Sequence, residues 1–214
     1  MQILSNTGGI AATNSYLIAD ENSGQAVLFD APDHTVAPLL EVAKKRNWEI
    51  VGLWLTHGHF DHVADHAVLT EKFPKARVLI HRLDEPKLIE PNSLFFPLPF
   101  EIPPRNADGY VEDGQAMKIG ALELNVIHTP GHSPGHVAYH FPRQNILIGG
   151  DLIMMNSVGR TDFPDSDFGQ LQESLRRVMK LPIQTRLLPG HGPTSTLAEE
   201  AARNPYVIEA MSAG

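Results

Sequence analysis

Short apolar runs that end in histidine or aspartate constrain this chain more than any other feature. The run IVGLWLT, residues 50–56, is nearly continuous and has the length of a strand that is buried on both faces. It leads directly into HGHFDH, residues 57–62, and later runs close as NILIGGD, residues 145–151, and RLLPGHG, residues 186–192. Because titratable groups are costly to bury without partners, their placement at several strand ends predicts a functional site.

The rest of the chain alternates strand-like and helix-like stretches. We predict strands at residues 14–20, 25–31, 50–56, 76–81, 122–129, 136–142, 145–151 and 186–190. We predict helices at residues 35–46, 63–73 and 168–180, with a short final helix. Strands that alternate with helices but also form hairpin-like pairs indicate an α/β sandwich with the sheets inside. Two loops of similar character, LWLTHGHFDH and LNVIHTPGHSPGH, hint at an internal duplication.

Composition excludes several classes of protein. The chain of 214 residues is 42% hydrophobic and 20% charged, which is ordinary for a folded soluble protein. Its apolar runs are too short to cross a membrane, and the N-terminal residues do not resemble a signal peptide. The net charge of −8 argues against nucleic-acid binding. The absence of cysteine excludes a thiolate metal site and fits a cytoplasmic protein, so we expect a cytoplasmic location.

The segment 86–108 differs from its surroundings because it holds six prolines and three phenylalanines. Six prolines predict that it forms neither a regular helix nor a central strand. It has two interpretations, a linker between two halves of the chain or an apolar flap that covers a site or a subunit contact. In the second interpretation Phe95, Phe96 and Phe100 would border the site or the contact.

The histidine cluster predicts a metal centre. His57 and His59 alternate, so an extended backbone projects both imidazoles to one side. Without cysteine, imidazole and carboxylate ligands must bind the metal, and this set suits zinc, iron or manganese. The candidate ligands are the histidines and aspartates that follow the apolar runs: His57, His59, Asp61, His62, His132, Asp151 and His191.

The motif THGHFDH, together with the later histidines and aspartate, resembles that of the metallo-β-lactamase superfamily over nearly the whole chain. The resemblance implies a four-layer αβ/βα sandwich. It also implies one domain over residues 1–214, with pseudo-duplicated halves of roughly 1–105 and 106–214. The superfamily's ligand pattern, carried over position by position, places His57, His59 and His132 on one ion. It places Asp61, His62 and His191 on a second ion, with Asp151 bridging both, and zinc is the expected metal ahead of iron or manganese.

Within the superfamily, VGRTDFP (158–164) and the segment 188–206 resemble the short bacterial glyoxalase II-like hydrolases. That resemblance implies hydrolysis of hydroxyacylglutathione thioesters such as S-lactoylglutathione by a metal-bridging hydroxide, with Asp61 and Asp151 as the catalytic carboxylates. It also implies that Arg160 binds the glycine carboxylate of glutathione, whereas a structural ion pair of Arg160 with Asp162 or Asp165 is the alternative. The chain departs from full-length glyoxalase II, whose helical C-terminal region adds glutathione contacts, because only 23 residues follow His191.

Other functions remain open at this point. GRTDF also occurs in persulfide dioxygenases, which hold one iron through two histidines and an aspartate; here these would be His57, His132 and Asp151. A lactonase or a β-lactamase would use the same two-metal hydroxide. A non-catalytic metal-binding module is the alternative outside enzymology, and it is disfavoured because all seven ligands are kept.

The remaining polar groups receive structural interpretations. We expect His34, His81 and His140 to lie on the surface or in satisfied, partly buried positions. We expect His66 to face solvent rather than the ligands, and His128 and His136 to hold the loop of His132 through hydrogen bonds. Asp30 and Asp65 are candidates to orient ligand imidazoles through their second nitrogen.

Overall fold

The structure, a computed structural model, describes residues 1–93 and 97–212 and divides them into two compact units. Unit 1 comprises residues 1–111 and 118–122, and unit 2 comprises residues 112–117 and 123–214, of which the last two are not described. The predicted division into halves at 105 and 106 lies close to this boundary. That the whole chain acts as one domain stays a prediction.

Unit 1 is built on a six-stranded mixed sheet in the order β1-β2-β3-β4-β5-β6. Its strands are β1 (Gln2–Gly8), β2 (Thr13–Asp20), β3 (Gln25–Phe29), β4 (Glu49–Trp54), β5 (Arg77–Ile80) and β6 (Gly109–Tyr110). The first three strands form antiparallel pairs, and β3, β4, β5 and β6 run parallel to one another. Because β3, β4 and β5 are parallel, their carboxyl ends share one edge of the sheet, where binding residues gather in open α/β sheets.

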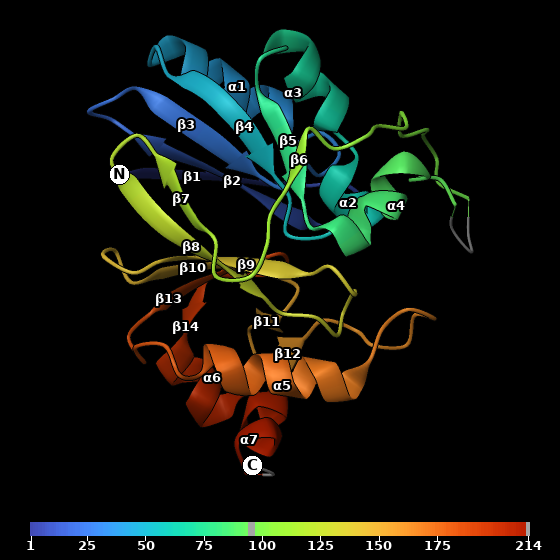
Figure 1. The fold of residues 1–214 in the computed structure, drawn as a ribbon, viewed down its shortest axis with the longest axis vertical. Helices are drawn as coiled ribbons and strands as arrows, with labels where there is room; N and C mark the ends of the chain where they lie inside the picture. Colours follow the sequence, from blue (N-terminus) through green and yellow to red (C-terminus); the bar gives the residue numbers. More distant parts are fainter. Residues whose placement is uncertain (94–96, 213–214) are drawn as a thin grey trace. The chain divides into compact units, whose positions relative to one another are not determined.

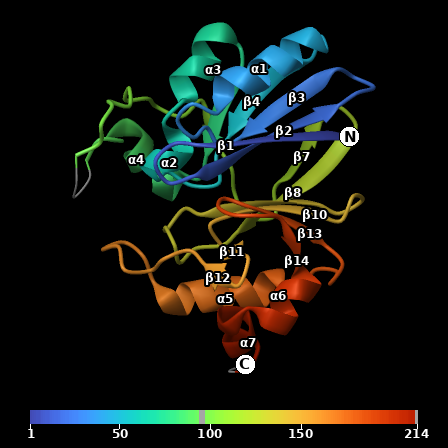
Figure 2. The ribbon, with the colours of Figure 1, turned by 180° about the vertical axis from the view of Figure 1, so that it is seen from behind.

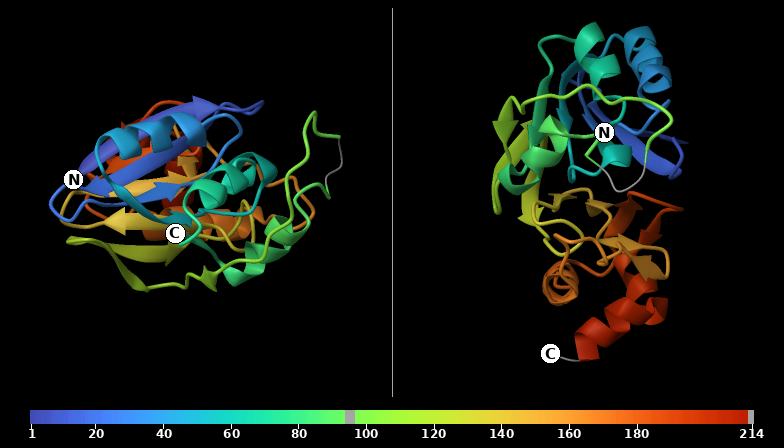
Figure 3. Two further views of the ribbon diagram at one scale, coloured as in Figure 1. Left: turned by 90° about the horizontal axis from the view of Figure 1, so that it is seen from above. Right: turned by 90° about the vertical axis from the view of Figure 1, so that its right-hand side faces the viewer.

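The helices of unit 1 are α1 (Val36–Lys45), α2 (Phe60–Val63), α3 (His66–Lys72) and α4 (Glu85–Ile89), with a 3₁₀ turn η1 (Arg82–Asp84). Helices α1 and α3 cover one face of the sheet (Figures 1 and 2, and from above in Figure 3). Helix α1 buries its apolar residues at helical spacing against strand residues such as Leu28 and Leu53. Its last turn carries Lys44 and Lys45, whose positive charges interact favourably with the negative end of the helix dipole.

Unit 2 carries most of the second six-stranded sheet, in the order β14-β13-β10-β9-β8-β7, and a two-stranded ribbon of β11 and β12, while the end of β7 and the first residue of β8 are counted in unit 1. Its strands are β7 (Ala116–Ile119), β8 (Leu122–His128), β9 (Val137–Phe141), β10 (Ile146–Gly150), β11 (Ile153–Met154), β12 (Ser157–Val158), β13 (Arg186–Pro189) and β14 (Ser195–Thr196). Strands β10 and β13 are parallel, so the residues that follow them lie at the same sheet edge.

Three helices pack against this sheet: α5 (Phe168–Val178), α6 (Leu197–Arg203) and α7 (Pro205–Ser212). Figures 1 and 2 show α5 and α6 along one face of the sheet. Leu171 and Leu175 of α5 are fully buried against strand residues such as Leu147 and Leu187, and α7 closes the same core with Val207. The predicted α/β class, with two mixed sheets and their helices, is therefore confirmed.

Several elements differ from the sequence-based expectation. Strand β1 was not predicted, and the helix expected over 63–73 is divided into α2 and α3. The single final helix is two helices, because Pro205 begins α7 directly after α6. Across the described residues, no helix combines the length and the apolar character needed to cross a bilayer.

The proline-rich segment is only partly irregular. Helix α4 lies inside it, and the expectation that its prolines forbid a helix is wrong there. Pro86 stands in the first turn of α4, where a missing N–H breaks no hydrogen bond within the helix.

Later in the segment, Ile102 is fully buried in the core of unit 1, and Asn92 hydrogen-bonds both its backbone N–H and its carbonyl. Phe100 packs against the same core, so this part of the segment folds back onto unit 1. Phe95 and Phe96, which we expected to border a site or a contact, lie outside the described residues.

His140 in β9 also departs from expectation, because it is 7% exposed and its Nε2 finds no hydrogen-bond partner among the described residues. Burial lowers the pKa of His140 below the usual value of about 6.5. The unfolded chain therefore takes up a proton at this position at a higher pH than the folded chain. The stability linked to His140 is present above about pH 6.5 and is lost as the pH falls below that value.

We expect His140→Leu to be more stable relative to the unchanged protein at pH 5.5 than at pH 8, because leucine has no proton to gain on unfolding. Equilibrium urea denaturation of the metal-free protein at both pH values measures this. His34→Gln is the control, since the side chain of His34 is 89% exposed. The prediction would be contradicted if the difference in unfolding free energy between His140→Leu and the unchanged protein were the same at both pH values.

Candidate metal centre

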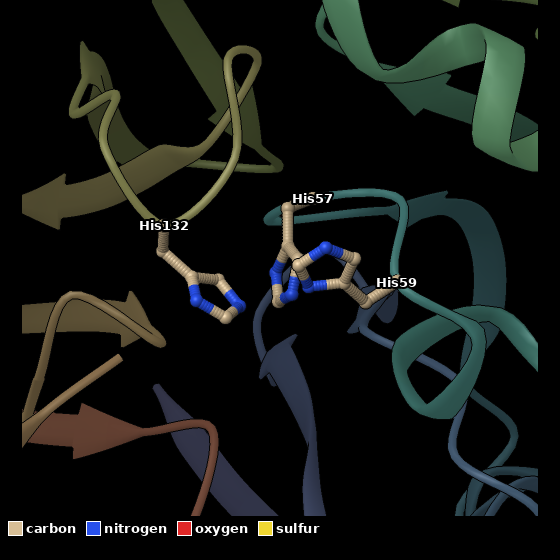
Figure 4. Close-up of side chains that lie close together, drawn as sticks. All are labelled: His57, His59 and His132. Carbon is tan, nitrogen blue, oxygen red and sulfur yellow. The ribbon is translucent and has the colours of Figure 1, made fainter. Parts of the chain in front are cut away.

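The first group of candidate ligands occupies the carboxyl end of β4 in unit 1. After β4 the chain passes through Thr56 to His57, and His59 is the N-cap of the short helix α2 that carries Asp61 and His62. His57 and His62 are fully buried. Figure 4 shows the imidazoles of His57 and His59 on the loop that follows β4.

These four side chains converge within unit 1. The potential ligand atoms of His57 lie within 4.8 Å of those of both His59 and His62, and Asp61 stands in the same relation to His62. The His57 and His62 rings are 4.0 Å apart between centroids, and Asp61 Oδ2 is 3.6 Å from His62 Nε2. Four groups that gather so closely form a surface of nitrogen and oxygen donors suited to a divalent cation.

Asp30 fixes the tautomers of two of these histidines. Its Oδ2 accepts from Thr56 Oγ1 at 2.8 Å and lies 2.9 Å from His62 Nδ1, which must donate because an ionised carboxylate can only accept. The hydroxyl hydrogen of Thr56 is used in the hydrogen bond to Asp30, so Thr56 Oγ1 accepts a hydrogen bond from His57 Nδ1 at 3.0 Å. In both imidazoles Nε2 is then the unprotonated nitrogen, which is the atom that a metal ion takes. The expected contact of Asp30 with the second nitrogen of a candidate ligand is therefore present at His62, and its orienting role in metal binding stays a prediction.

Sequence reasoning missed two further residues that hold this loop. Thr13, buried at the start of β2, donates from Oγ1 to Asp61 Oδ2 at 2.7 Å. Asp84, fully buried in η1, accepts from the backbone N–H of Gly58 at 2.9 Å. A side chain at Gly58 would place Cβ 2.7 Å from the Asp84 carbonyl oxygen, so only glycine fits between the two ligand histidines. Asp84 follows β5 at the same sheet edge, and this position after a strand was the sequence feature that could have indicated its role in holding the loop.

The second group of candidate ligands lies in unit 2, where His132 follows β8, Asp151 follows β10 and His191 follows β13. Asp151 Oδ2 is 3.4 Å from His132 Nε2 and 3.3 Å from His191 Nε2. Figure 4 shows the His132 imidazole at the end of its loop. One carboxylate oxygen therefore lies within 3.4 Å of two imidazole nitrogens.

The loop of His132 is held in place by main-chain acceptors. His132 Nδ1 donates to the carbonyl oxygen of Arg160 at 2.8 Å, which leaves Nε2 as the unprotonated nitrogen. Gly159 lies beneath this ring. A Cβ added at Gly159 would lie 2.9 Å from the His132 ring and would collide with the Asp151 carbonyl oxygen. The sequence Gly-Arg at 159–160 thus supports a ligand through its backbone.

The other histidines of this loop support it as predicted. His136 Nε2 accepts from the Asp151 backbone N–H at 3.0 Å, and its Nδ1 therefore donates to Thr129 Oγ1 at 2.8 Å. His128 Nε2 donates to the Pro134 carbonyl at 2.9 Å. Both residues hydrogen-bond the loop, and neither is among the candidate ligands.

Two expectations for unit 1 are wrong. His66 is 2% exposed rather than solvent-facing, and its Nε2 donates to the Pro103 carbonyl at 2.8 Å, so it secures the proline-rich segment. Asp65 does not orient a ligand imidazole; its Oδ2 accepts from the Val36 backbone N–H at 3.3 Å, at the start of α1. Burial raises the pKa of Asp65.

The Arg160 side chain points away from the hydrogen bond that its backbone makes. Its Nε and Nη2 donate to the two carboxylate oxygens of Asp162 at 2.6 and 2.5 Å, and both side chains are exposed. The guanidinium carbon lies 4.6 Å from the centre of the Phe163 ring, a cation–π contact. The predicted alternative partner Asp162 is therefore in place, and a substrate-binding role for Arg160 stays a prediction.

The donor set fits divalent metals. The tautomers of His57, His62 and His132 each present an unprotonated Nε2, and the aspartates supply oxygen ligands. Because the chain has no cysteine, soft thiolate sites are excluded, and imidazole with carboxylate matches zinc, iron or manganese. Each of the two units thus presents its own group of nitrogen and oxygen donors.

Comparison with known proteins identifies the family that the sequence motifs resemble, and the match includes residues of both units. The model of the metallo-β-lactamase superfamily matches residues 8–191. An uncharacterized protein of Aquifex aeolicus is 34% identical over 95% of this chain and 96% of its own length. The hydroxyacylglutathione hydrolase GloC of Haemophilus influenzae is 29% identical over 91% of this chain and 92% of its own length.

Solved structures agree. The protein TTHA1623, in a di-iron-bound form, is 36% identical and matches with a TM-score of 0.82 over 95% of this chain and 99% of its own. The BLEG-1 B3 metallo-β-lactamase matches at 0.84 with 29% identity, over 96% and 99% of the two chains. ETHE1 from Myxococcus xanthus matches at 0.80 with 28% identity, over 98% and 85%.

We expect Asp30→Asn to weaken metal binding by about 10- to 100-fold, because an amide cannot accept three hydrogen bonds and would turn N–H groups toward His62 and Thr56. Competition titration with a chromophoric chelator measures the affinity.

The matched control is Asp65→Asn, which changes another buried carboxylate near α2 that does not contact a candidate ligand. Both variants need circular dichroism to show that they are folded. Equal loss of affinity in the two folded variants would mean that Asp30 has no orienting role.

Proposed function

This chain belongs to the metallo-β-lactamase superfamily and is a metal-dependent hydrolase, and from this premise we propose that it hydrolyses thioesters, with hydroxyacylglutathione as the substrate class. The observation that carries the proposal is the pair of donor groups, each preset by hydrogen bonds to bind a cation. The substrate class is supported by the resemblance of GRTDFP and by relatives named hydroxyacylglutathione hydrolase.

We propose that the two donor groups hold two metal ions in one centre. One ion would be held by His57, His59 and His132, and the other by Asp61, His62 and His191. Asp151 would serve both, in keeping with the position of its Oδ2 between His132 and His191. TTHA1623 in its di-iron-bound form supports a binuclear centre, and the ligand chemistry admits zinc, iron or manganese, with zinc as our first choice.

Two bound cations would lower the pKa of a water molecule toward neutrality and would neutralise the charge that develops on a carbonyl oxygen. The chain's own residues then have limited tasks. Asp61, held by Thr13, accepts a hydrogen bond from the attacking water and directs its lone pair toward the carbonyl carbon. The water loses one proton to solvent to become hydroxide, and attack by the hydroxide forms the new C–O bond. The C–S bond then breaks with its electron pair on sulfur, and the second proton passes to the thiolate or to solvent as the carboxylate is released. A thiolate leaves without prior protonation, so the reaction needs no general acid.

Some relatives named hydroxyacylglutathione hydrolase are longer than this chain. The hydroxyacylglutathione hydrolase of Mesorhizobium japonicum is 32% identical, but this chain covers only 60% of its length. Under our proposal, Arg160 is the candidate for the glycine carboxylate of glutathione.

A second candidate function is a mononuclear-iron persulfide dioxygenase. The motif GRTDF at 159–163 favours it, since the same motif occurs in that branch of the superfamily. Such an enzyme would need only His57, His132 and Asp151 as ligands. The two candidates therefore differ in whether Asp61, His62 and His191 are needed.

We expect two metal ions per chain after zinc loading, measured by elemental analysis of the desalted protein. Asp151→Ala should lower the content to one ion or fewer, because its carboxylate serves both. The control is Asp113→Asn, a carboxylate of unit 2 that pairs with Arg177 instead. A single ion per chain under excess zinc would remove the binuclear proposal.

We expect His191→Ala to slow S-lactoylglutathione hydrolysis by at least about 100-fold, because loss of one ion removes several kcal/mol of transition-state stabilisation. Release of the thiol, followed with a thiol reagent, measures the rate, and His34→Ala is the control. The iron-loaded protein should consume no oxygen with glutathione persulfide. Rapid oxygen uptake without hydrolysis, and a silent His191→Ala, would establish the dioxygenase instead.

A further inference from the structure

The short stretch from Gly159 to Phe163 performs two separate tasks around the ligand His132. Its backbone supports the ligand, since the Arg160 carbonyl accepts from His132 Nδ1 and Gly159 lies beneath the ring. Its side chains form a layer on one side, because the Arg160 guanidinium covers Phe163, and the Phe163 ring centre lies 6.1 Å from that of His132. The guanidinium therefore contacts a ring that itself contacts the candidate ligand His132, and the Arg160 side chain stays exposed to solvent.

Asp162 occupies the recognition edge of that guanidinium. The pairing is bidentate and uses Nε and Nη2, one of the two edges by which arginine binds a carboxylate with parallel hydrogen bonds. The hydrogen bonds with Arg160 lower the pKa of Asp162, so its carboxylate is ionised at neutral pH. A carboxylate of a substrate must either displace Asp162 or bind the remaining edge beside a second negative charge.

We propose that Asp162 is a specificity-determining residue that competes, within the chain, with the carboxylate of an anionic thioester for Arg160. This inference rests on the proposed function, because it takes Arg160 as the group that receives the substrate's carboxylate. Exposed ion pairs between flexible side chains are weak, so the competition is modest and a substrate anion can overcome it. Asp162 therefore raises the KM for carboxylate-bearing thioesters and narrows the advantage that Arg160 gives them over neutral ones.

The test compares two ligands that differ in one group, S-lactoylglutathione and its glycine ethyl ester, with zinc-loaded protein at fixed ionic strength. We expect Asp162→Asn to raise the ratio of kcat/KM for the acid over the ester by roughly two- to fivefold, since a weak competitor is removed. In an Arg160→Ala background the same substitution should leave the ratio unchanged. Asp165→Asn removes the same charge from the same loop and should also leave it unchanged.

Calorimetric binding of S-methylglutathione and of its glycine ethyl ester provides a second measurement that does not need turnover. It separates failure of this inference from failure of the proposed function, because a chain that hydrolyses neither thioester still reports its preference for the carboxylate. A lower affinity of Asp162→Asn for the acid would make Asp162 a residue that positions Arg160, and would overturn the inference. An equal gain in Asp165→Asn, or a gain that survives Arg160→Ala, would reduce the effect to general charge and would overturn it as well.

Discussion

The buried carboxylate of Asp30 is the interaction on which the first donor group depends. It accepts from the backbone N–H and the hydroxyl of Thr56 and from His62 Nδ1, and through Thr56 it also sets His57. Asp30 itself adopts a left-handed backbone conformation with φ 57°, which few residues other than glycine, asparagine and aspartate tolerate. The end of β3 therefore carries conformational strain so that one side chain can face the end of β4. In the parallel arrangement of these strands that contact is short-range, although 26 residues separate Asp30 from Thr56.

The sequence allowed the candidate ligand residues to be located because they obey local rules, and their binding of metal stays a prediction. Alternation puts His57 and His59 on one side of an extended backbone, and strand ends bring carboxylates and imidazoles to a sheet edge. The supporting residues were harder to predict because their contacts are long-range. Thr13 and Asp61 are 48 residues apart, and nothing in the spacing of either residue indicates their hydrogen bond.

The same distinction explains the errors in the fold. Helix α1 was predicted because its apolar spacing is regular, whereas α4 was missed because proline was taken as a breaker without regard to its place in the first turn. His66 was expected in solvent because its position relative to the proline-rich segment depends on how residues near Pro103 return to unit 1. Burial of this kind is decided by tertiary packing, which a pattern of single residues does not contain.

The hydrogen bond from His132 to the Arg160 carbonyl has a consequence for how such a protein diversifies. Every amino acid offers the same main-chain carbonyl, so the ligand keeps its orientation whichever side chain stands at position 160. Gly159 has no such latitude, because any side chain there collides with its surroundings. Two adjacent positions thus evolve under opposite constraints, one held by steric exclusion and the other open to exchange. Under the proposed function, in which the side chain at position 160 contacts the substrate, a lineage that varies this position would sample new substrates while the candidate ligand His132 keeps its main-chain support.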